Sequence, residues 1–253
     1  MTKLHKTLRS RMEKAILDYA MIKSGDRILV GVSGGPDSLT LLKLLHDRFI
    51  YVKDDFSLFV LHIDLGFQEA EPKSWFRLEL YFQELGVDYR IVHTDISSRA
   101  LDPRARKNPC FICSLNRRRA VYETAHEQGC NKIAYGHHKD DIVETLLINI
   151  LYGRKIEAMC PVQEIFRGKM HIIRPLTYVE ENLLKKFAQE SSLPALPRLC
   201  PADGKTRRQR VKEIISSLQR SEKNANIREN IFKSLRHVKI TSTPFATKNA
   251  TKI

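Results

Sequence analysis

The residues with the clearest chemical potential form a short loop, Ser33-Gly34-Gly35-Pro36-Asp37-Ser38, called here the glycine loop. Its two adjacent glycines allow a sharp turn that exposes backbone amides without interference from a Cβ atom. A helix that starts directly after such a loop adds free N–H groups and a positive dipole end, which bind anions. The serine hydroxyls are further donors, and a carboxylate at Asp37 suits a Mg²⁺ ion that bridges it to phosphates. The loop therefore predicts a nucleotide phosphate site.

The glycine loop differs from the two commonest phosphate-binding loops. It matches neither G-x-x-x-x-G-K-[ST], which supports γ-phosphoryl transfer, nor G-x-G-x-x-G. The structural alternative is a tight turn of small residues between a strand and a helix. Because six positions fit the anion-binding interpretation, we favour it.

Cysteines form the second group with chemical potential. Cys110 and Cys113 make a C-x-x-C pair before three arginines at 117–119, and Cys200 lies far along the chain beside the basic run 205–212. A helix start and nearby cations favour thiolates. Three thiolates can hold a [4Fe–4S] cluster with one open iron, or a Zn²⁺ ion with a fourth ligand from elsewhere. A third interpretation is a persulfide on one cysteine that another resolves.

The two other cysteines are expected to be structural. Cys130 stands at the start of a predicted core strand, and Cys160 lies in a predicted hairpin. Free cysteine is commonly interior, so both are predicted to be small buried residues.

These residues need elements that position them. Apolar segments predict a buried strand at 27–32 and further strands at 57–63, 89–93 and 131–136. Helical periodicity predicts helices at 4–19, 38–49, 73–85, 114–128 and 140–151. Short apolar strands that alternate with helices indicate an α/β fold with a doubly wound parallel sheet.

The predicted domain organisation has three parts. Residues 1–155 would form the nucleotide-binding core with the C-x-x-C loop. Residues 156–240 would form a C-terminal extension with a hairpin around Gly168, the third cysteine and basic helices near 180–192, 206–219 and 226–236. The last part, 241–253, is rich in Thr and Lys and is predicted to be disordered.

The composition of the chain narrows the range of functions that it can have. The chain has 253 residues, of which 43 are Lys or Arg and 29 are Asp or Glu, a net charge of +14. Such a surplus attracts polyanions, although it also keeps a surface soluble. Five cysteines without a secretory N-terminal segment argue against a disulfide framework and for the cytoplasm. No apolar run reaches the roughly 20 residues of a membrane helix.

S-G-G-x-D-S resembles the PP-loop of enzymes that split ATP between its α and β phosphates. LHIDLG (61–66) and GHHKDD (136–141) fit the same family. The resemblance implies that ATP and Mg²⁺ are bound by Ser33, Gly34, Gly35, Asp37, Ser38, the backbone of Ile63, Gly136 and Asp141. Asp141 at a helix start could instead be only a cap, and neither His137 nor His138 is assigned as a base.

The ordered set of PP-loop, C-x-x-C, GHHKDD, IRPL (173–176) and a late cysteine is similar to the tRNA 2-thiocytidine synthetases. The resemblance implies that ATP activates the C2 oxygen of a cytidine in the anticodon loop and that an iron–sulfur cluster then delivers sulfur. It makes Cys110, Cys113 and Cys200 the cluster ligands, with Zn²⁺ as the alternative. Together with Asp37 and Asp141 these cysteines would be the catalytic residues.

The resemblance also implies partners. Basic residues around 104–119 and 205–212 would bind the anticodon arm of tRNA, mainly through its phosphates. Sulfur would come from a donor such as a cysteine desulfurase or sulfide. Arg174 would line the nucleotide or RNA side of the cleft, or serve only as a surface ion-pair residue. The sequence leaves open whether the chain forms a homodimer.

Two departures from the family keep alternatives open. Pro36 stands where the cytidine thiolases usually have Lys, as in the lysidine synthetases, so a PP-loop ligase that joins an amine to tRNA is one alternative. Asp203 stands where a second cysteine of a late C-x-x-C is usual. A uridine thiolase is less expected, because no cysteine precedes Cys110. The non-enzymatic alternative is an RNA-binding module with a structural nucleotide.

Overall fold

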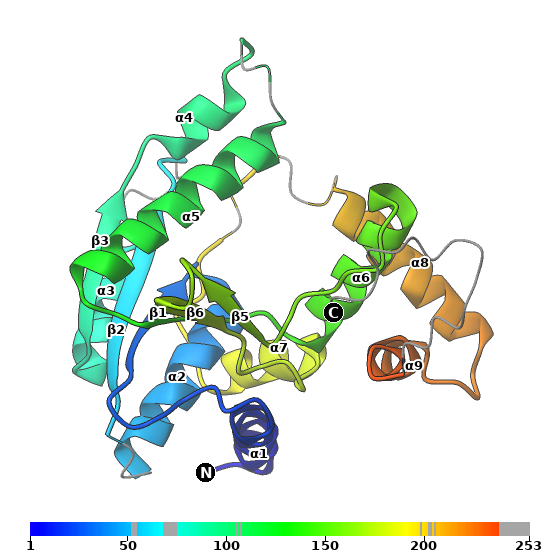
Figure 1. Ribbon diagram of the computed structural model, residues 1–253, viewed down its shortest axis with the longest axis horizontal. Helices are drawn as coiled ribbons and strands as arrows, with labels where there is room; N and C mark the ends of the chain where they lie inside the picture. Colours follow the sequence, from blue (N-terminus) through cyan, green and yellow to red (C-terminus); the bar gives the residue numbers. More distant parts are fainter. Residues whose placement is uncertain are drawn as a thin grey trace.

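The computed structural model describes residues 1–51, 55–67, 75–104, 106, 108–197, 199–201, 204 and 206–237 (Figure 1). The predicted tail 241–253 and the residues Lys107, Asp203 and Lys205 lie outside this part of the chain. No helix in the described ranges has the length and apolar character needed to cross a membrane.

A six-stranded sheet with the strand order β3-β2-β1-β4-β6-β5 forms the centre of the fold. The strands are β1 (Arg27–Val32), β2 (Ser57–Asp64), β3 (Asp88–His93), β4 (Lys132–Tyr135), β5 (Val162–Ile165) and β6 (Met170–Ile173). All neighbours pair in parallel except β5 and β6. The predicted α/β class with a parallel sheet is confirmed, and its first four strands are the predicted ones.

Nine helices are found in the described part of the chain. They are α1 (Lys3–Asp18), α2 (Pro36–Tyr51), α3 (Phe76–Leu85), α4 (Ile96–Leu101), α5 (Pro109–Glu127), α6 (Lys139–Gly153), α7 (Glu181–Glu190), α8 (Arg207–Ser221) and α9 (Ile227–Ser234). The sequence predicted no helix at 96–101, where the structure has the short helix α4. Helix α5 begins at Pro109, so the C-x-x-C pair lies in its first turns.

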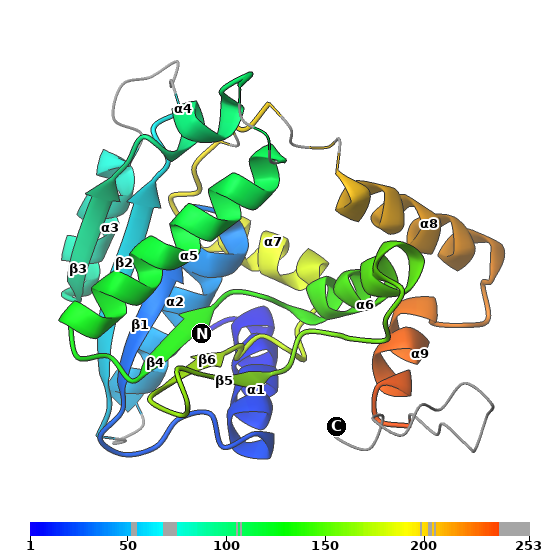
Figure 2. The ribbon, with the colours of Figure 1, turned by 45° about the horizontal axis from the view of Figure 1, so that its top comes forward.

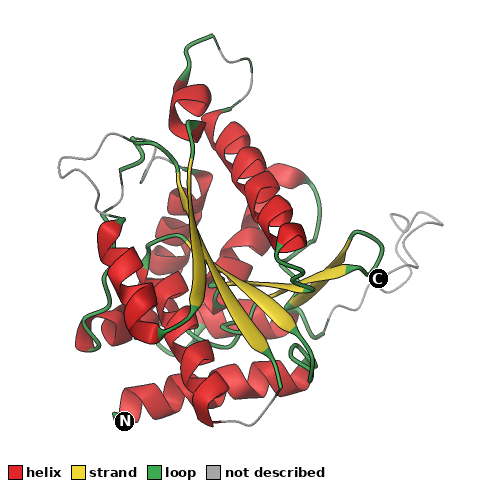
Figure 3. Ribbon diagram, turned by 90° about the vertical axis from the view of Figure 1, so that its left-hand side faces the viewer, coloured by secondary structure: helices red, strands yellow, loops and turns green. Residues whose placement is uncertain are grey.

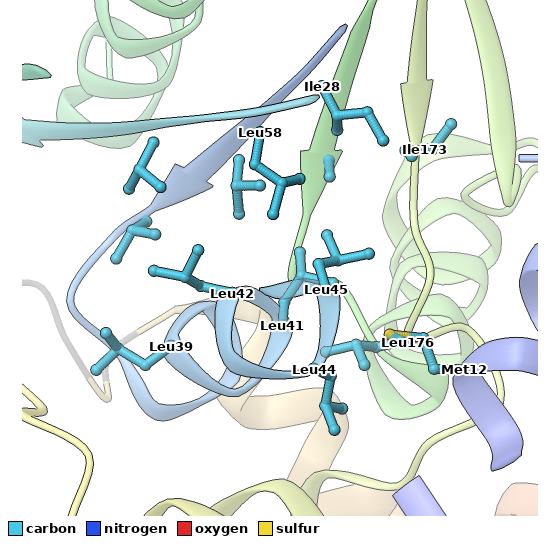
Figure 4. Packing of buried hydrophobic residues seen from close by; sticks show 14 of the residues in the cluster. Met12, Ile28, Leu39, Leu41, Leu42, Leu44, Leu45, Leu58, Ile173 and Leu176 are labelled. Atoms are coloured by element: carbon cyan, nitrogen blue, oxygen red, sulfur yellow. The ribbon is translucent and has the colours of Figure 1, made fainter. Parts of the chain in front are cut away.

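Helices cover both faces of the sheet, as Figure 3 shows. One face packs on α1, α2, α3 and α7 through a large cluster of buried side chains, which includes Ile28, Leu58 and Ile173 from the strands (Figure 4). The run SLTLLKLL makes α2 apolar nearly all round, and its leucines fill the space beneath β1 and β2. The other face packs on α4 and α5 through Ile96, Val121 and Ala125.

The predicted hairpin is found as the antiparallel pair β5 and β6, with Gly168 at a φ of +81° in its turn. Strand β6 pairs with β4, so the central sheet continues past residue 155. Helices α8 and α9 follow and pack on α6 through Val143, Val211 and Ile215. Figure 2 shows this group at the opposite side of the molecule from β3.

The strand order reverses at β1, because β2 and β3 lie on one side of it and β4 on the other. Ligands of open α/β sheets bind in the crevice at such a switch point, beyond the carboxyl ends of the strands. The glycine loop follows β1, and residues 136–141 follow β4. The topology therefore brings the two predicted nucleotide-binding segments together.

Candidate nucleotide and cysteine site

The glycine loop forms a closed turn held by its own serines. The backbone N–H of Ser33 donates to the Ser38 hydroxyl at 3.1 Å, and that hydroxyl donates to the carbonyl of Gly35 at 3.0 Å. Gly34 has a φ of +84°, which an L side chain adopts only with strain. Helix α2 begins at Pro36, whose fixed φ suits a first helical position. The turn and the helix start together form the geometry of an anion site.

The end of β4 lies directly against this helix start. A Cβ atom added to Gly136 would lie 2.9 Å from the backbone N of Ser38 and 3.0 Å from the carbonyl atoms of Asp37. Only a glycine allows this approach. Gly136 thus has a packing role, and it brings the GHHKDD segment to the glycine loop.

The carboxyl end of β2 lies beside the end of β1. Val32 is in register with His62, so Ile63 stands one residue beyond the last paired position of β1. The Ile63 side chain is buried in the cluster beneath α4 and α5. Its backbone therefore lies at the sheet edge where the adenine contact was predicted, and that contact stays a prediction.

Two carboxylates, Asp37 and Asp141, flank the buried imidazole of His138. The His138 Nε2 atom lies 3.9 Å from Asp37 Oδ2 and 3.4 Å from Asp141 Oδ2. Burial raises the pKa of Asp37, His138 opposes this shift, and the charges of Asp141 and Glu181 raise it further. Asp37 Oδ1 is buried and has no hydrogen-bond partner among the described residues. An unpartnered buried carboxylate oxygen fits a cation ligand.

The N-cap of α6 is His138, and Asp141, the third helical residue, accepts a hydrogen bond from the backbone N–H of His138 at 3.1 Å as part of a capping box. Its other oxygen accepts from Arg208 Nη1 on α8 at 2.8 Å. The alternative that Asp141 is only an N-cap is wrong, since His138 holds that position; the capping box uses one of the two Asp141 oxygens. The neighbouring His137 is neutral near pH 7, since burial lowers its pKa to about 4.

Glu144 was missed by sequence reasoning. It lies one turn after Asp141 on α6, is fully buried, and its carboxylate accepts no hydrogen bond from the described residues. Burial raises its pKa to about 7, although Lys212 and Arg208 on α8 lie 3.6 and 3.7 Å away. The signal was present in DDIVE, because residues three apart share a helix face.

Two cations of the basic run 205–212, Arg208 and Lys212, pair with acidic side chains. Lys212 donates to Glu181 at 2.9 Å as well as approaching Glu144, and Arg208 pairs with Asp141. These two cations are therefore engaged by acids of the candidate site, which the contiguous basic run in the sequence did not reveal.

The C-x-x-C pair lies at the N-terminal end of α5. The Asn108 side chain caps this helix by accepting from the backbone N–H of Cys110 at 2.9 Å. Cys110 is exposed and Cys113 is partly buried. Burial raises the pKa of Cys113, Arg117 opposes the shift, and Cys200 and Cys110 raise it further.

Cys200 is thus close enough to act electrostatically on Cys113, although 87 positions separate them in the sequence. Figure 2 shows the segment between α7 and α8 passing the N-terminal end of α5. Within the ranges that the structure describes, no three side chains of His, Cys, Asp or Glu lie close enough together to hold a metal ion as they stand. The three thiols share one region without forming a finished metal site.

Three other predictions are settled by burial. Cys130 is buried in the core, as predicted. Cys160 is exposed, so its predicted burial is wrong; it precedes β5 at the edge of the sheet. Arg174 is not a surface residue, since it is 7% exposed and donates to the Cys160 carbonyl at 2.5 Å and to Gln163 Oε1 at 3.2 Å. Arg174 therefore connects the end of β6 to β5 and to the residues that precede it.

Comparisons with known proteins agree with this architecture. A family model described as a PP-loop domain matches residues 4–217. The tRNA-cytidine(32) 2-sulfurtransferase of Methylobacillus flagellatus is 39% identical over 238 residues, which cover 93% of this chain and 77% of that protein. The protein of the same name from Dechloromonas aromatica is 41% identical over 216 residues, covering 84% of this chain and 74% of its own length.

A solved structure has a similar fold. The U34-tRNA thiolase NcsA from Methanococcus maripaludis, solved with its [4Fe-4S] cluster, superposes with a TM-score of 0.75 at 22% identity. The match covers 93% of this chain and 80% of that one.

Proposed function

The chain belongs to the PP-loop domain family, and from this premise we propose that it is an ATP-dependent tRNA sulfurtransferase. Its substrate is the cytidine at position 32 of the anticodon loop, by analogy with the names of relatives that cover most of the chain. The observation that carries the proposal is the glycine loop, whose serine-held turn and helix start form an anion site against the GHHKDD segment, in a chain that also carries the C-x-x-C pair at the start of α5. The proposed reaction uses ATP and tRNA, so we propose the cytoplasm as its location.

The first step is activation of the base. The C2 oxygen of cytidine attacks the α-phosphorus of ATP, the bond to the bridging oxygen breaks, and pyrophosphate leaves. Backbone amides of the glycine loop and the hydroxyls of Ser33 and Ser38 bind the phosphates. Asp37, with its unpartnered buried oxygen, and Asp141 would hold Mg²⁺, which offsets the charge of the leaving pyrophosphate.

The second step replaces oxygen by sulfur. A sulfur nucleophile attacks C2 of the adenylated base, and AMP leaves with the former C2 oxygen. Cys110, Cys113 and Cys200 would hold a [4Fe–4S] cluster, which supplies an iron that can bind the incoming sulfur. The thiols suit such a group by their chemistry, because thiolates are the usual ligands of iron–sulfur clusters and Cys110 and Cys113 stand three residues apart in the first turns of α5, which places them on one helix face. The sulfur itself would come from a cysteine desulfurase or from sulfide.

The identity of the metal and its ligands is tested by anaerobic purification followed by analysis for iron, sulfide and zinc. Cys110→Ser, Cys113→Ser and Cys200→Ser should each lose iron, whereas Cys160→Ser should retain it, since Cys160 is exposed, like Cys110 and Cys200, but lies outside the group. An active, colourless protein with stoichiometric zinc would replace the cluster by the zinc alternative. Iron retained in Cys200→Ser would remove Cys200 from the ligand set.

The activity is tested by mass spectrometry of tRNA nucleosides from cells with and without the gene. Loss of a thiolated cytidine supports the proposal, loss of a thiolated uridine indicates a uridine thiolase, and loss of an amine adduct indicates a ligase. Pro36 motivated the ligase, but its place at the first position of α2 gives it a structural explanation. AMP release that requires tRNA would exclude the non-catalytic RNA-binding module.

A further inference from the structure

The segment between α7 and α8 makes a specific contact with the glycine loop. The backbone N–H of Leu196 donates to the carbonyl oxygen of Gly34 at 2.9 Å. The Leu196 side chain is partly buried against the large core cluster. The segment is therefore anchored at this point by a hydrogen bond and by apolar packing.

The Leu196 side chain lies directly on Gly34. A Cβ atom added to Gly34 would lie 2.8 Å from Leu196 Cδ1 and 2.9 Å from its Cγ. The absence of a side chain at residue 34 thus serves two purposes, the positive φ of the turn and this close approach.

The hydrogen bond acts on a peptide unit that faces the predicted phosphate site. The carbonyl of Gly34 and the N–H of Gly35 belong to one planar trans peptide, so they point in opposite directions. When Leu196 holds the carbonyl on one side, the Gly35 N–H is directed to the other. That N–H makes only a long 3.4 Å hydrogen bond to the Ser33 hydroxyl, so it can turn to an anion.

The same segment leads to the third cysteine. Cys200 follows Leu196 by four positions in the sequence, a span of at most about 14 Å. Pro194, Pro197 and Pro201 restrict the backbone of the segment, and a proline also restricts the residue before it. A displacement at Leu196 is therefore transmitted to Cys200, which acts on Cys113.

We propose that Leu196 is a positioning residue that orients the Gly34–Gly35 peptide for phosphate and couples phosphate binding there to the position of Cys200. The inference rests on the proposed ATP site but not on the nature of the metal. When nucleotide binds to the glycine loop, it fixes the orientation of the Gly34–Gly35 peptide. Leu196 moves together with the Gly34 carbonyl, and the accessibility of the Cys200 thiol changes.

The test uses the full-length, metal-free, reduced protein and a non-hydrolysable ATP analogue. Alkylation rates of Cys200 and of the reference Cys160 are followed by peptide mass spectrometry, with analogue binding measured separately by calorimetry. In the wild type, the analogue should change the Cys200 rate by about fivefold or more, within the usual range of coupling between two sites, and leave Cys160 unchanged. Leu196→Ala keeps the backbone N–H but removes the side chain that packs on Gly34, so this change should decrease and the analogue should bind more weakly.

Leu193→Ala is the matched control. Leu193 packs on the same core, but its N–H donates to the Ala188 carbonyl in the C-terminal turn of α7, so the response of Cys200 should persist. Should Leu196→Ala not fold, Leu196→Val shortens the same contact and should reduce the response. An unchanged response in the Leu196 variant, or analogue binding to the wild type without any change at Cys200, overturns this inference alone. Failure of the wild type to bind the analogue overturns the proposed function as well.

Discussion

Gly136→Ala probes the contact on which the nucleotide site depends. The new Cβ atom would lie 2.9 Å from the N of Ser38 and 3.0 Å from the Asp37 carbonyl, whereas ordinary contact begins at 3.4 Å. These are backbone atoms in the first turn of α2, so no side-chain rotation can relieve the overlap. The end of β4 and the start of α2 must therefore separate by about half an ångström.

The cost follows from the way cores respond to overpacking. Extra carbon atoms in a well-packed region typically cost about 1–3 kcal/mol. For a chain of this size each kcal/mol lowers the melting temperature by about 2–4 °C, so a decrease of about 2–12 °C is expected. Because the displaced atoms include the amide at the start of α2, ATP binding should weaken in parallel.

Thermal unfolding and calorimetric titration with an ATP analogue measure the two effects. Gly153→Ala is the control: it ends α6, its added Cβ would lie no closer than 3.5 Å to any atom, and its melting temperature should not fall. Gly35→Ala separates the two effects, because its Cβ would meet only the Ser33 hydroxyl at 3.5 Å, so it should lose affinity for the analogue but little stability. A melting temperature of Gly136→Ala equal to that of the wild type would refute the close approach of β4 and α2.

Three further predictions concern the charged residues of the site. The pKa of Glu144 is raised to about 7, so its contribution to stability is fully present below its unfolded pKa near 4.5 and is lost as the pH rises through 7. In urea titrations at a series of pH values, the unfolding free energy of Glu144→Gln should therefore decrease less between pH 4.5 and 7 than that of the wild type. Arg208→Ala should weaken binding of the ATP analogue about tenfold, the magnitude of one charged hydrogen bond, and Arg208→Lys should be intermediate. The reason is that the negative charges of Asp141 and Glu144 would face the phosphates without the cation that pairs with them. An unchanged dissociation constant contradicts this. Asp37→Asn should lower tRNA-dependent AMP release about a hundredfold or more while the melting temperature does not fall, since the carboxylate has a raised pKa and an unpartnered oxygen; near-normal turnover would exclude a role in metal binding.

The strands and the glycine loop were predictable because local signals fix them. β1 and β2 are continuous apolar runs, and the turn between β1 and α2 needs glycines whatever surrounds it. The hairpin was equally local, with Gly168 in its turn. The short helix α4 was missed because six residues give too little periodicity, and its burial against α5 is a tertiary effect.

The partners of charged residues could not be predicted, since they depend on how helices distant in sequence meet. Arg208 stands in a run of cations without an acid, which reads as a solvent-facing surface. Only the packing of α8 on α6 reveals that Asp141 lies opposite it. The exposure of Cys160 has the same origin, because its residue type favours burial while the sheet edge leaves it uncovered.

The approach of Cys200 to Cys113 is expected from the family resemblance, but no local sequence signal indicates it, and its physical basis explains why. The segment that carries Cys200 is anchored by a backbone N–H of Leu196, and every residue except proline offers that group. Its acceptor is the carbonyl of a glycine, which has no side chain that could specify a partner. The pairing is therefore determined by the positive φ of Gly34, which directs its carbonyl, and by the space that the missing Cβ leaves for Leu196. Gly34 thus helps to position a cysteine that lies 166 positions away in the sequence, and replacing Gly34 should disturb the Cys200 thiol as well as the phosphate site.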